Sequence, residues 1–127
     1  MTRQWKNINC YALSDDGKQF ALGTYSGSIF VLTIVGDQRV TEFEIKRHSK
    51  CIMCLTFHKK NIVSVSYDKI YIETTIETNV QNEKILTYSQ HLLNDVPRSL
   101  ISRGDKVYMS YLSGLYWLEN GKMLGFS

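Results

Sequence analysis

The sequence contains a single proline, and none of its hydrophobic runs approaches the roughly 18 residues that a membrane-spanning helix needs. The first seven residues, Met-Thr-Arg-Gln-Trp-Lys-Asn, lack the hydrophobic segment of a secretory signal, so we expect none. Gly-x-Gly-x-x-Gly, P-loop and Gly-x-Ser-x-Gly motifs are also absent. The common forms of dinucleotide binding, nucleotide hydrolysis and serine hydrolysis are therefore not expected.

Cysteine is scarce as well, with three in 127 residues, and no Asn-x-Ser/Thr sequon occurs. An odd number of cysteines without a signal peptide favours a reducing location, and we expect an intracellular protein of the cytoplasm or nucleus.

One group of residues has a spacing that resembles a zinc site: His48-x-x-Cys51-x-x-Cys54-x-x-x-His58. The segment also has the period of a strand, in which side chains three positions apart point to opposite faces. A zinc knuckle needs a turn between its cysteines, and a redox Cys-x-x-Cys usually opens a helix; neither is expected here. We therefore predict no metal and no cofactor.

The charge is low and dispersed. Lysine and arginine total 15 against 12 acidic residues, which gives a formal net charge of +3. Positive residues cluster only in short groups, Lys46-Arg47-His48 and Lys59-Lys60. A nucleic-acid-binding domain usually presents a concentrated basic face, so direct contact with nucleic acid is not expected.

Aromatic and β-branched residues, in contrast, are plentiful, and they alternate with polar residues along most of the chain. Alternation with a period of two predicts strands, and Asp16-Gly17 and Asn120-Gly121 are strong hairpin-turn signals. The first unit has four predicted strands, at 8–13, 20–24, 29–34 and 40–45. Both faces of 8–13 are apolar, so we expect this strand to be covered on both sides, and we expect 40–45 to be an exposed edge.

The same arrangement recurs twice. The second unit has predicted strands at 52–57, 62–66, 70–74 and 85–88, and the third at 98–101, 107–111, 115–118 and 123–126. Residues 83–93 could also form a short amphipathic helix from their apolar spacing, and the repeat favours the strand.

The spacing of the units identifies the architecture. Val31, Ile72 and Trp117 fall at matching places in the third strands, 41 and 45 residues apart. Four strands in each period of about 40–45 residues are typical of β-propeller blades. A two-sheet sandwich would also have many short strands, but it would not require self-similarity. We predict an all-β chain, a single domain over 1–127, with blades at about 8–46, 52–90 and 98–127.

Residues 8–34 and 48–74 resemble consecutive WD repeats, although no Trp-Asp dipeptide occurs. In that family a histidine, a serine or threonine, an aspartate and a tryptophan form a buried hydrogen-bonded network. The resemblance implies such a network from His48, Ser64 or Ser66, and Asp68, with Ile72 or Glu73 at the tryptophan position. The first unit offers Thr24 and Ser26, and the third Ser110, Ser113 and Trp117.

Three units are fewer than the four to eight blades of a typical propeller. We therefore expect the chain to be part of a larger propeller, or to complete one by self-association or with other protein subunits. The resemblance implies a non-catalytic scaffold that binds proteins through inter-strand loops, with these candidate contact residues: Tyr25, Arg47, His48, Tyr67, Lys69 and Tyr111. A ligand-binding or enzymatic propeller and a subunit of a nucleic-acid-associated complex stay open as alternatives.

Overall fold

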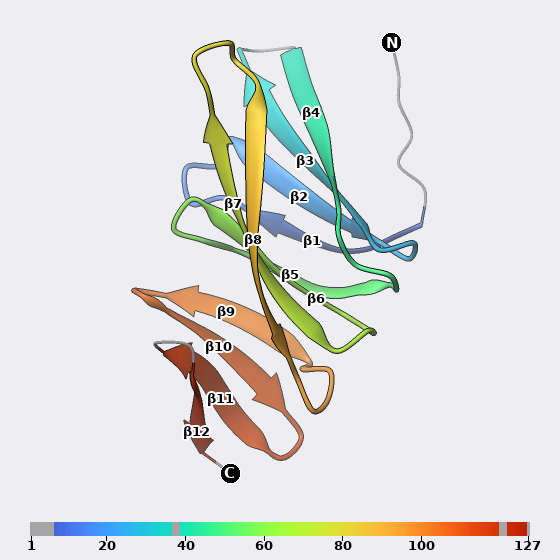
Figure 1. Ribbon diagram of the computed structural model, residues 1–127, viewed down its shortest axis with the longest axis vertical. Coiled ribbons are helices and arrows are strands. Elements are labelled where there is room, and N and C mark those ends of the chain that lie inside the picture. The colour runs from blue at the N-terminus through green and yellow to red at the C-terminus, as the bar shows by residue number, and fades with distance from the viewer. Residues whose placement is uncertain (1–6, 37–38, 120–121, 127) are drawn as a thin grey trace.

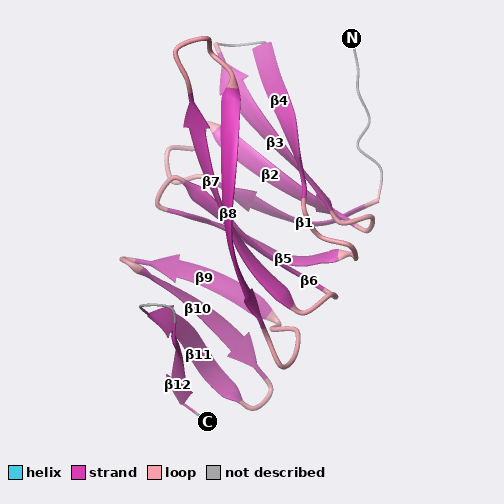
Figure 2. Cartoon of the chain, viewed as in Figure 1, coloured by secondary structure: helices cyan, strands magenta, loops and turns pink. Residues whose placement is uncertain are grey.

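The computed structural model describes residues 7–36, 39–119 and 122–126, and these residues form twelve β-strands (Figure 1). Colouring by secondary structure shows strands and loops throughout the described residues, and no helix (Figure 2). Within the same ranges, no helix has the length and hydrophobicity that crossing a bilayer requires. The prediction of an all-β chain is confirmed.

The strands form three separate sheets of four, each an antiparallel meander in chain order. We call these sheets blades 1, 2 and 3. Blade 1 contains β1 (Ile8–Leu13), β2 (Gln19–Thr24), β3 (Ser28–Val35) and β4 (Arg39–Lys46). Blade 2 contains β5 (Ile52–His58), β6 (Asn61–Ser66), β7 (Ile70–Thr78) and β8 (Lys84–Leu92). Blade 3 contains β9 (Ser99–Arg103), β10 (Lys106–Tyr111), β11 (Gly114–Glu119) and β12 (Lys122–Phe126).

Local turn chemistry sets the meander. In the β1–β2 turn, Gly17 has φ +74° and its N–H donates to the Ser14 carbonyl at 3.0 Å, while Asp16 Oδ1 accepts from the Lys18 N–H at 2.9 Å. Glycine reaches this backbone region without steric cost, which explains the Asp-Gly pair. Two other predicted turns, at 36–38 and 119–122, include residues outside the described ranges, so their turn types are not assigned.

The segment with competing helix and strand signals is the strand β8. It pairs antiparallel with β7 over nine positions, from Ile70↔Leu92 to Thr78↔Lys84. This long ladder supplies the backbone hydrogen bonds that a helix would otherwise have provided.

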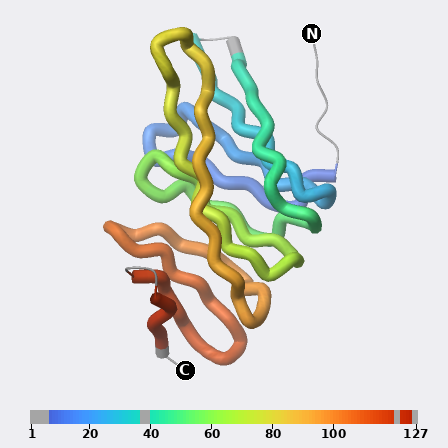
Figure 3. The backbone as a smooth tube through the Cα atoms, in the orientation of Figure 1, coloured from blue at the N-terminus to red at the C-terminus, as the bar shows by residue number. Residues whose placement is uncertain are grey.

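The blades follow one another along the chain, and each is completed before the next begins (Figure 3). The closest backbone approaches between blades join the first strand of each, β1 to β5 and β5 to β9. This arrangement, in which the first strands of successive blades lie next to one another, is the radial packing of a propeller and differs from a two-sheet sandwich.

Two apolar clusters fill the spaces between blades. The first joins blades 1 and 2 through Ala21, Ile29, Val31, Ile45, Ile52, Leu55, Phe57 and Ile62. The second joins blades 2 and 3 through Cys54, Val63, Val65, Tyr71, Leu93, Val107 and Met109. Blade 2 is therefore covered on both faces. Burial of apolar surface against each neighbouring blade is the main contribution to the stability of this packing.

The expectation that 8–13 would be covered on both faces is wrong. Tyr11 is 73% exposed and Leu13 is 51% exposed, whereas the residues at the same register in blade 2, Leu55 and Phe57, are 8% and 9% exposed. The difference arises because blade 1 covers the corresponding face of blade 2, and no blade within the described residues covers that face of blade 1.

Candidate functional site

The turns and linkers that carry the candidate contact residues lie at one end of the blades. An antiparallel meander places every second connection at the same end, here the β2–β3, β6–β7 and β10–β11 turns together with the linkers 47–51 and 93–98. We call this the linker end. All six residues predicted for partner binding are in these connections or border them.

The linker 47–51 is held between the turns of blades 1 and 2. Gly27 has φ +94°, and a Cβ on it would lie 2.5 Å from the His48 carbonyl oxygen, so only glycine allows the turn to approach so closely. On the other side, Ser66 Oγ donates to the Lys50 carbonyl at 2.9 Å and the Tyr67 N–H donates to the Cys51 carbonyl at 3.0 Å. The two turns and the linker therefore form one continuous surface.

A buried histidine anchors that surface. His48 is 6% exposed, and its Nδ1 lies 3.0 Å from Asp68 Oδ2, while its Nε2 lies 2.8 Å from Ser64 Oγ. Asp68 Oδ2 also accepts from the Ser49 N–H at 3.3 Å. The imidazole is thus satisfied at both nitrogens, as a buried polar ring must be.

Of the two serines considered from the sequence, Ser64 contacts His48, and Ser66 has a different position. Ser66 Oγ bonds to Lys50, as described above, and accepts from the Asp68 N–H at 3.2 Å. Asp68 Oδ1 then accepts from the Ile70 N–H at 2.9 Å, and Lys69 takes φ +65°. The Ser66 hydroxyl therefore helps to orient Asp68, and this network of hydrogen bonds fixes the conformation of the β6–β7 turn.

Electrostatics favour a neutral imidazole in this network. Burial lowers the pKa of His48, and this effect outweighs the hydrogen bond and negative charge of Asp68, which act in the opposite direction. At neutral pH, the uncharged ring can donate from Nδ1 to the carboxylate and accept at Nε2 from the Ser64 hydroxyl.

The candidate contact residues differ in accessibility. Tyr25 and Tyr67 occupy the same place in the turns of blades 1 and 2 and are 58% and 59% exposed. Arg47 and Lys69 are exposed as well, and the Arg47 guanidinium carbon lies 4.6 Å from the centre of the Tyr88 ring, a cation–π distance. His48 is buried and so has an internal role.

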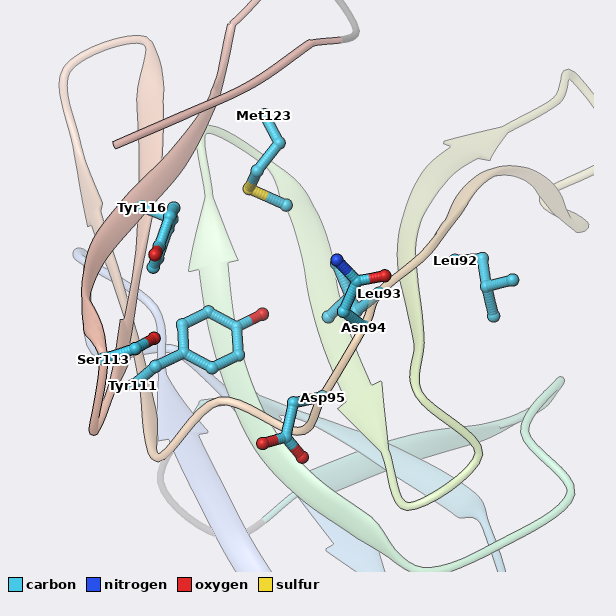
Figure 4. Close-up of a pocket in the computed structure, with 8 residues that line it drawn as sticks. All are labelled: Leu92, Leu93, Asn94, Asp95, Tyr111, Ser113, Tyr116 and Met123. Carbon is cyan, nitrogen blue, oxygen red and sulfur yellow. The ribbon is translucent and has the colours of Figure 1, made fainter. Parts of the chain in front are cut away.

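Tyr111 also differs from the other two tyrosines. It ends strand β10, its ring packs edge-on against Tyr116 at 5.3 Å, and both line an open pocket of roughly 260 Å³ (Figure 4). Burial raises the pKa of Tyr111, with the charge of Asp95 as a second cause. The pocket lies between the linker after β8 and blade 3, and its other lining residues are Leu92, Leu93, Asn94, Asp95, Ser113 and Met123. No periodic pattern predicts this pocket, because four of its eight lining residues, Leu93, Asn94, Asp95 and Ser113, lie in connections between strands. Its size is below that of typical small-molecule sites.

The four residues with zinc-like spacing are dispersed. Cys54 donates to the Pro97 carbonyl at 3.3 Å, and His58 Nδ1 lies 2.7 Å from Ser102 Oγ, both toward blade 3. The His48 ring is bonded to Asp68 and Ser64 of blade 2, and Cys51 lies in the linker. Across the described parts of the chain, no group of three or more His, Cys, Asp and Glu residues is placed to hold a metal ion.

No family model matches the sequence, and no curated protein matches it either. Solved structures do match. One, described as the structure of U3-55K, has a TM-score of 0.68 and 20% identity over 94% of this chain and 36% of its own. Another, the crystal structure of RRP9 WD40 repeats, has a TM-score of 0.66 and 21% identity with the same coverage. The chain has the WD40 propeller-blade fold.

The propeller blades predicted from the repeat are thereby confirmed. This WD40-like chain spans about a third of the length of the two structures, and identity near 20% establishes the fold alone.

The resemblance leaves Ile72 or Glu73 at the tryptophan position, and the register shows which of these two residues lies beside Ser64. Ser64 is paired directly with Ile72, and Ser64 Oγ lies 3.5 Å from the Ile72 carbonyl oxygen. The isoleucine side chain has no N–H to donate, so no side chain continues the network beyond Ser64. The strand register also corrects the predicted match of Val31, Ile72 and Trp117 between the three blades. The residue of blade 2 that corresponds to Val31 and Trp117 is Glu73, one residue beyond Ile72.

Proposed function

We propose that this chain is a non-catalytic scaffold that binds other proteins through the linker end of its blades. The observation that carries the proposal is the pair of exposed tyrosines, Tyr25 and Tyr67, at equivalent turns of adjacent blades. Tyrosine is enriched at binding hot spots because it offers a large rigid surface with a polar tip.

The surface around the two tyrosines supports this role. Arg47 in the linker and Lys69 in the β6–β7 turn are exposed, and the linker 47–51 is held to both turns by the contacts of Gly27, Ser66 and Tyr67. A loop surface that is ordered before binding loses less conformational entropy when a partner docks. The positive side chains suit a partner with acidic residues around an apolar centre.

Within the proposal, the predicted residues have separate tasks. Tyr25, Arg47, Tyr67 and Lys69 contact the partner, whereas His48 and Asp68 are positioning residues that hold the β6–β7 turn. Tyr111 extends the surface toward blade 3 as the wall of a small pocket.

The proposal includes the completion of a ring. Three blades are fewer than the four to eight of a typical propeller, so in this proposal further blades come from the rest of a longer protein, from other protein subunits or from a second copy. We place this assembly inside the cell, in the cytoplasm or nucleus, where three free thiols are maintained.

The test is quantitative affinity capture from cells that express the full chain. We expect a Tyr25→Ala/Tyr67→Ala variant to lose most of the proteins that the wild type retains. A Val80→Ala variant is the matched control, because Val80 is 97% exposed in the β7–β8 turn at the opposite end of the blades. Equal capture by all three chains would refute docking at the linker end.

A further inference from the structure

The pocket beside Tyr111 opens between blades 2 and 3. Figure 4 shows the Tyr111 and Tyr116 rings on one side of it and the linker residues Leu93 and Asn94 on the other. All the residues that line it belong to these two blades and to the linker that joins them, so it is an internal groove of the repeat. Its volume of roughly 260 Å³ is below that of most small-molecule sites and leaves room for one long side chain.

Two aromatic rings form one wall of this pocket. The centres of the Tyr111 and Tyr116 rings are 5.3 Å apart and their planes are inclined at 85°, so the rings stand nearly perpendicular. Both rings are partly exposed. The face of an aromatic ring is electron-rich and attracts a cation within about 6 Å of its centre.

A carboxylate adds a full negative charge. Asp95 lines the pocket, is exposed, and lies close enough to Tyr111 for its charge to raise the pKa of the phenol. Asp95 Oδ1 accepts from the Val96 N–H at 2.8 Å, and no lysine or arginine in the described parts of the chain pairs with this carboxylate. The eight lining residues include no lysine, arginine or histidine. The ligand charge that the pocket favours is therefore positive.

The neighbouring interface, between blades 1 and 2, contains a cation supplied by the chain itself. Arg47 directly follows β4, and its guanidinium carbon lies 4.6 Å from the centre of the Tyr88 ring of β8. The linker between blades 2 and 3 begins instead with Leu93, which directly follows β8 and is 5% exposed. At this position, the first linker provides a guanidinium and the second does not.

The strand register shows that the pocket borders the corresponding place. In blade 2, Tyr88 is the last member of the row of paired residues that contains Ile62, the second residue of β6. In blade 3, Met123 is the last member of the row that contains Val107, the second residue of β10. Met123 is therefore the counterpart of Tyr88, and it lines the pocket.

The linker wall is held in place before any ligand binds. The Leu93 N–H donates to the Lys69 carbonyl and the Arg98 N–H donates to the Ser110 carbonyl, both at 2.7 Å. The first of these bonds ties the linker to the β6–β7 turn, which also carries Tyr67. The pocket thus continues the proposed docking surface, and its ordered wall reduces the entropy that is lost on binding.

We propose that this pocket binds an arginine side chain of a partner protein. The guanidinium packs against the Tyr111 and Tyr116 rings and pairs with the Asp95 carboxylate. Arginine suits the site better than lysine, because its planar group stacks on aromatic rings and can donate two parallel hydrogen bonds to a carboxylate. The inference rests on the proposed function, since it names one group of the partner that docks at the linker end.

An NMR titration of the full chain, labelled with ¹³C at the methionine methyl groups, tests the pocket. The probe is N-acetyl-arginine methylamide, and Met123 is the reporter because it lines the pocket. We expect the Met123 signal, assigned with Met123→Leu, to shift and saturate while the Met53 signal stays in place. Blocked citrulline has nearly the shape of the probe without its charge and should shift neither signal; blocked lysine should bind more weakly than arginine.

Variants locate the interaction. Asp95→Asn keeps an oxygen that can accept from the Val96 N–H and removes the charge, so the affinity for the arginine probe should fall roughly fivefold. Tyr116→Leu should weaken binding by a similar factor, and Tyr116→Phe, which keeps the ring, should not. Asp15→Asn is the matched control, because it removes the same charge from the exposed β1–β2 turn at the opposite end of the blades.

Three results would overturn the proposal. They are a Met123 signal that does not move with the arginine probe, an equal response to blocked citrulline, and an Asp95→Asn chain that binds arginine as tightly as the wild type.

The outcome is separable from that of the proposed function. If Tyr25→Ala/Tyr67→Ala loses its captured proteins but the arginine probe leaves Met123 unshifted, the scaffold stands and the arginine site is refuted. If the probe binds through Asp95 but the wild type and Tyr25→Ala/Tyr67→Ala capture the same proteins, docking at the linker end is refuted and the arginine site remains.

Discussion

His48 and Asp68 lie twenty residues apart in the sequence and meet with Nδ1 3.0 Å from Oδ2. Their contact joins the linker between blades 1 and 2 to the β6–β7 turn, so it sets the position of Tyr67 and Lys69 on the proposed docking surface. The predictions below begin with this pair.

Asp68→Ala should lower the free energy of unfolding by about 2 kcal/mol, because it leaves a buried histidine nitrogen and the Ser49 and Ile70 N–H groups without their acceptor. Urea denaturation followed by circular dichroism measures the change. Asp16→Ala is the matched control: Asp16 accepts comparable local bonds in an exposed turn, and its loss should be clearly smaller. Equal losses would show that the network adds nothing to stability.

Stability should fall as the pH is lowered through about 6.5, the ordinary pKa of histidine. Burial lowers the pKa of His48 in the folded chain, so in the window between its folded pKa and 6.5 the unfolded chain binds more protons. His48→Gln should flatten the dependence of the urea midpoint on pH in that window. Ser66→Ala, which leaves both ring contacts of His48 in place, should keep the wild-type slope. A His48→Gln slope equal to that of the wild type would contradict the assignment.

Gly23→Ala should destabilise the contact between blades 1 and 2. A Cβ at this position would lie 2.6 Å from Ile52 Cγ2 and 2.8 Å from Cys10 Sγ, so the neighbours must move. Overpacking of this kind costs roughly 1–3 kcal/mol. Thermal unfolding should also show that Gly23→Ala/Ile52→Ala loses less than the sum of the two single variants, because removal of the isoleucine side chain makes room. Simple additivity would argue that the two residues do not touch.

Cys51 should react fastest of the three thiols in the folded chain. Burial raises the pKa of Cys10 to about 12 and that of Cys54 to about 11, and both lie at contacts between blades. Cys51 lies in the linker and is less deeply buried. Titration with a chromogenic disulfide near neutral pH should give one fast thiol, lost in Cys51→Ser, and three fast thiols in urea. A fast phase that persists in Cys51→Ser would place the accessible thiol elsewhere.

The sequence was sufficient for the strands and their order, since these depend on local signals. Alternation and turn residues such as Asp16-Gly17 locate each hairpin, and the repeat favoured a strand, predicted at 85–88, where the structure has the longer strand β8. The register of the strands could not be predicted from these local signals. Both β1 and β5 contain an irregularity, between Ile8 and Cys10 and between Ile52 and Cys54, that shifts pairing without any compositional sign. Ser64 and Ser66 lie on the same face of β6, so alternation alone does not say which of them contacts His48, and sequence offsets do not give the pairing that aligns Trp117 with Glu73.

Exposure could not be predicted from the pattern alone. The residues of 8–13 are apolar on both faces because the repeat is built for neighbours on each side, and the sequence does not say which neighbours are present. Tyr111 has a similar explanation: the β10–β11 turn is shorter than the β6–β7 turn, so the tyrosine falls at the end of a strand, against Tyr116, and not in the turn.

The most direct measurement is the labelling rate of Tyr25 and Tyr67 by hydroxyl radicals in the full chain, free and bound to the proteins that it captures, read by mass spectrometry. Tyr25 and Tyr67 are 58% and 59% exposed within the chain, so both can be labelled before a partner docks. The account predicts slower labelling of both tyrosines in the bound chain, while Val80 at the opposite end of the blades is labelled equally in both states. Equal labelling of Tyr25 and Tyr67 in the free and bound chains would contradict it.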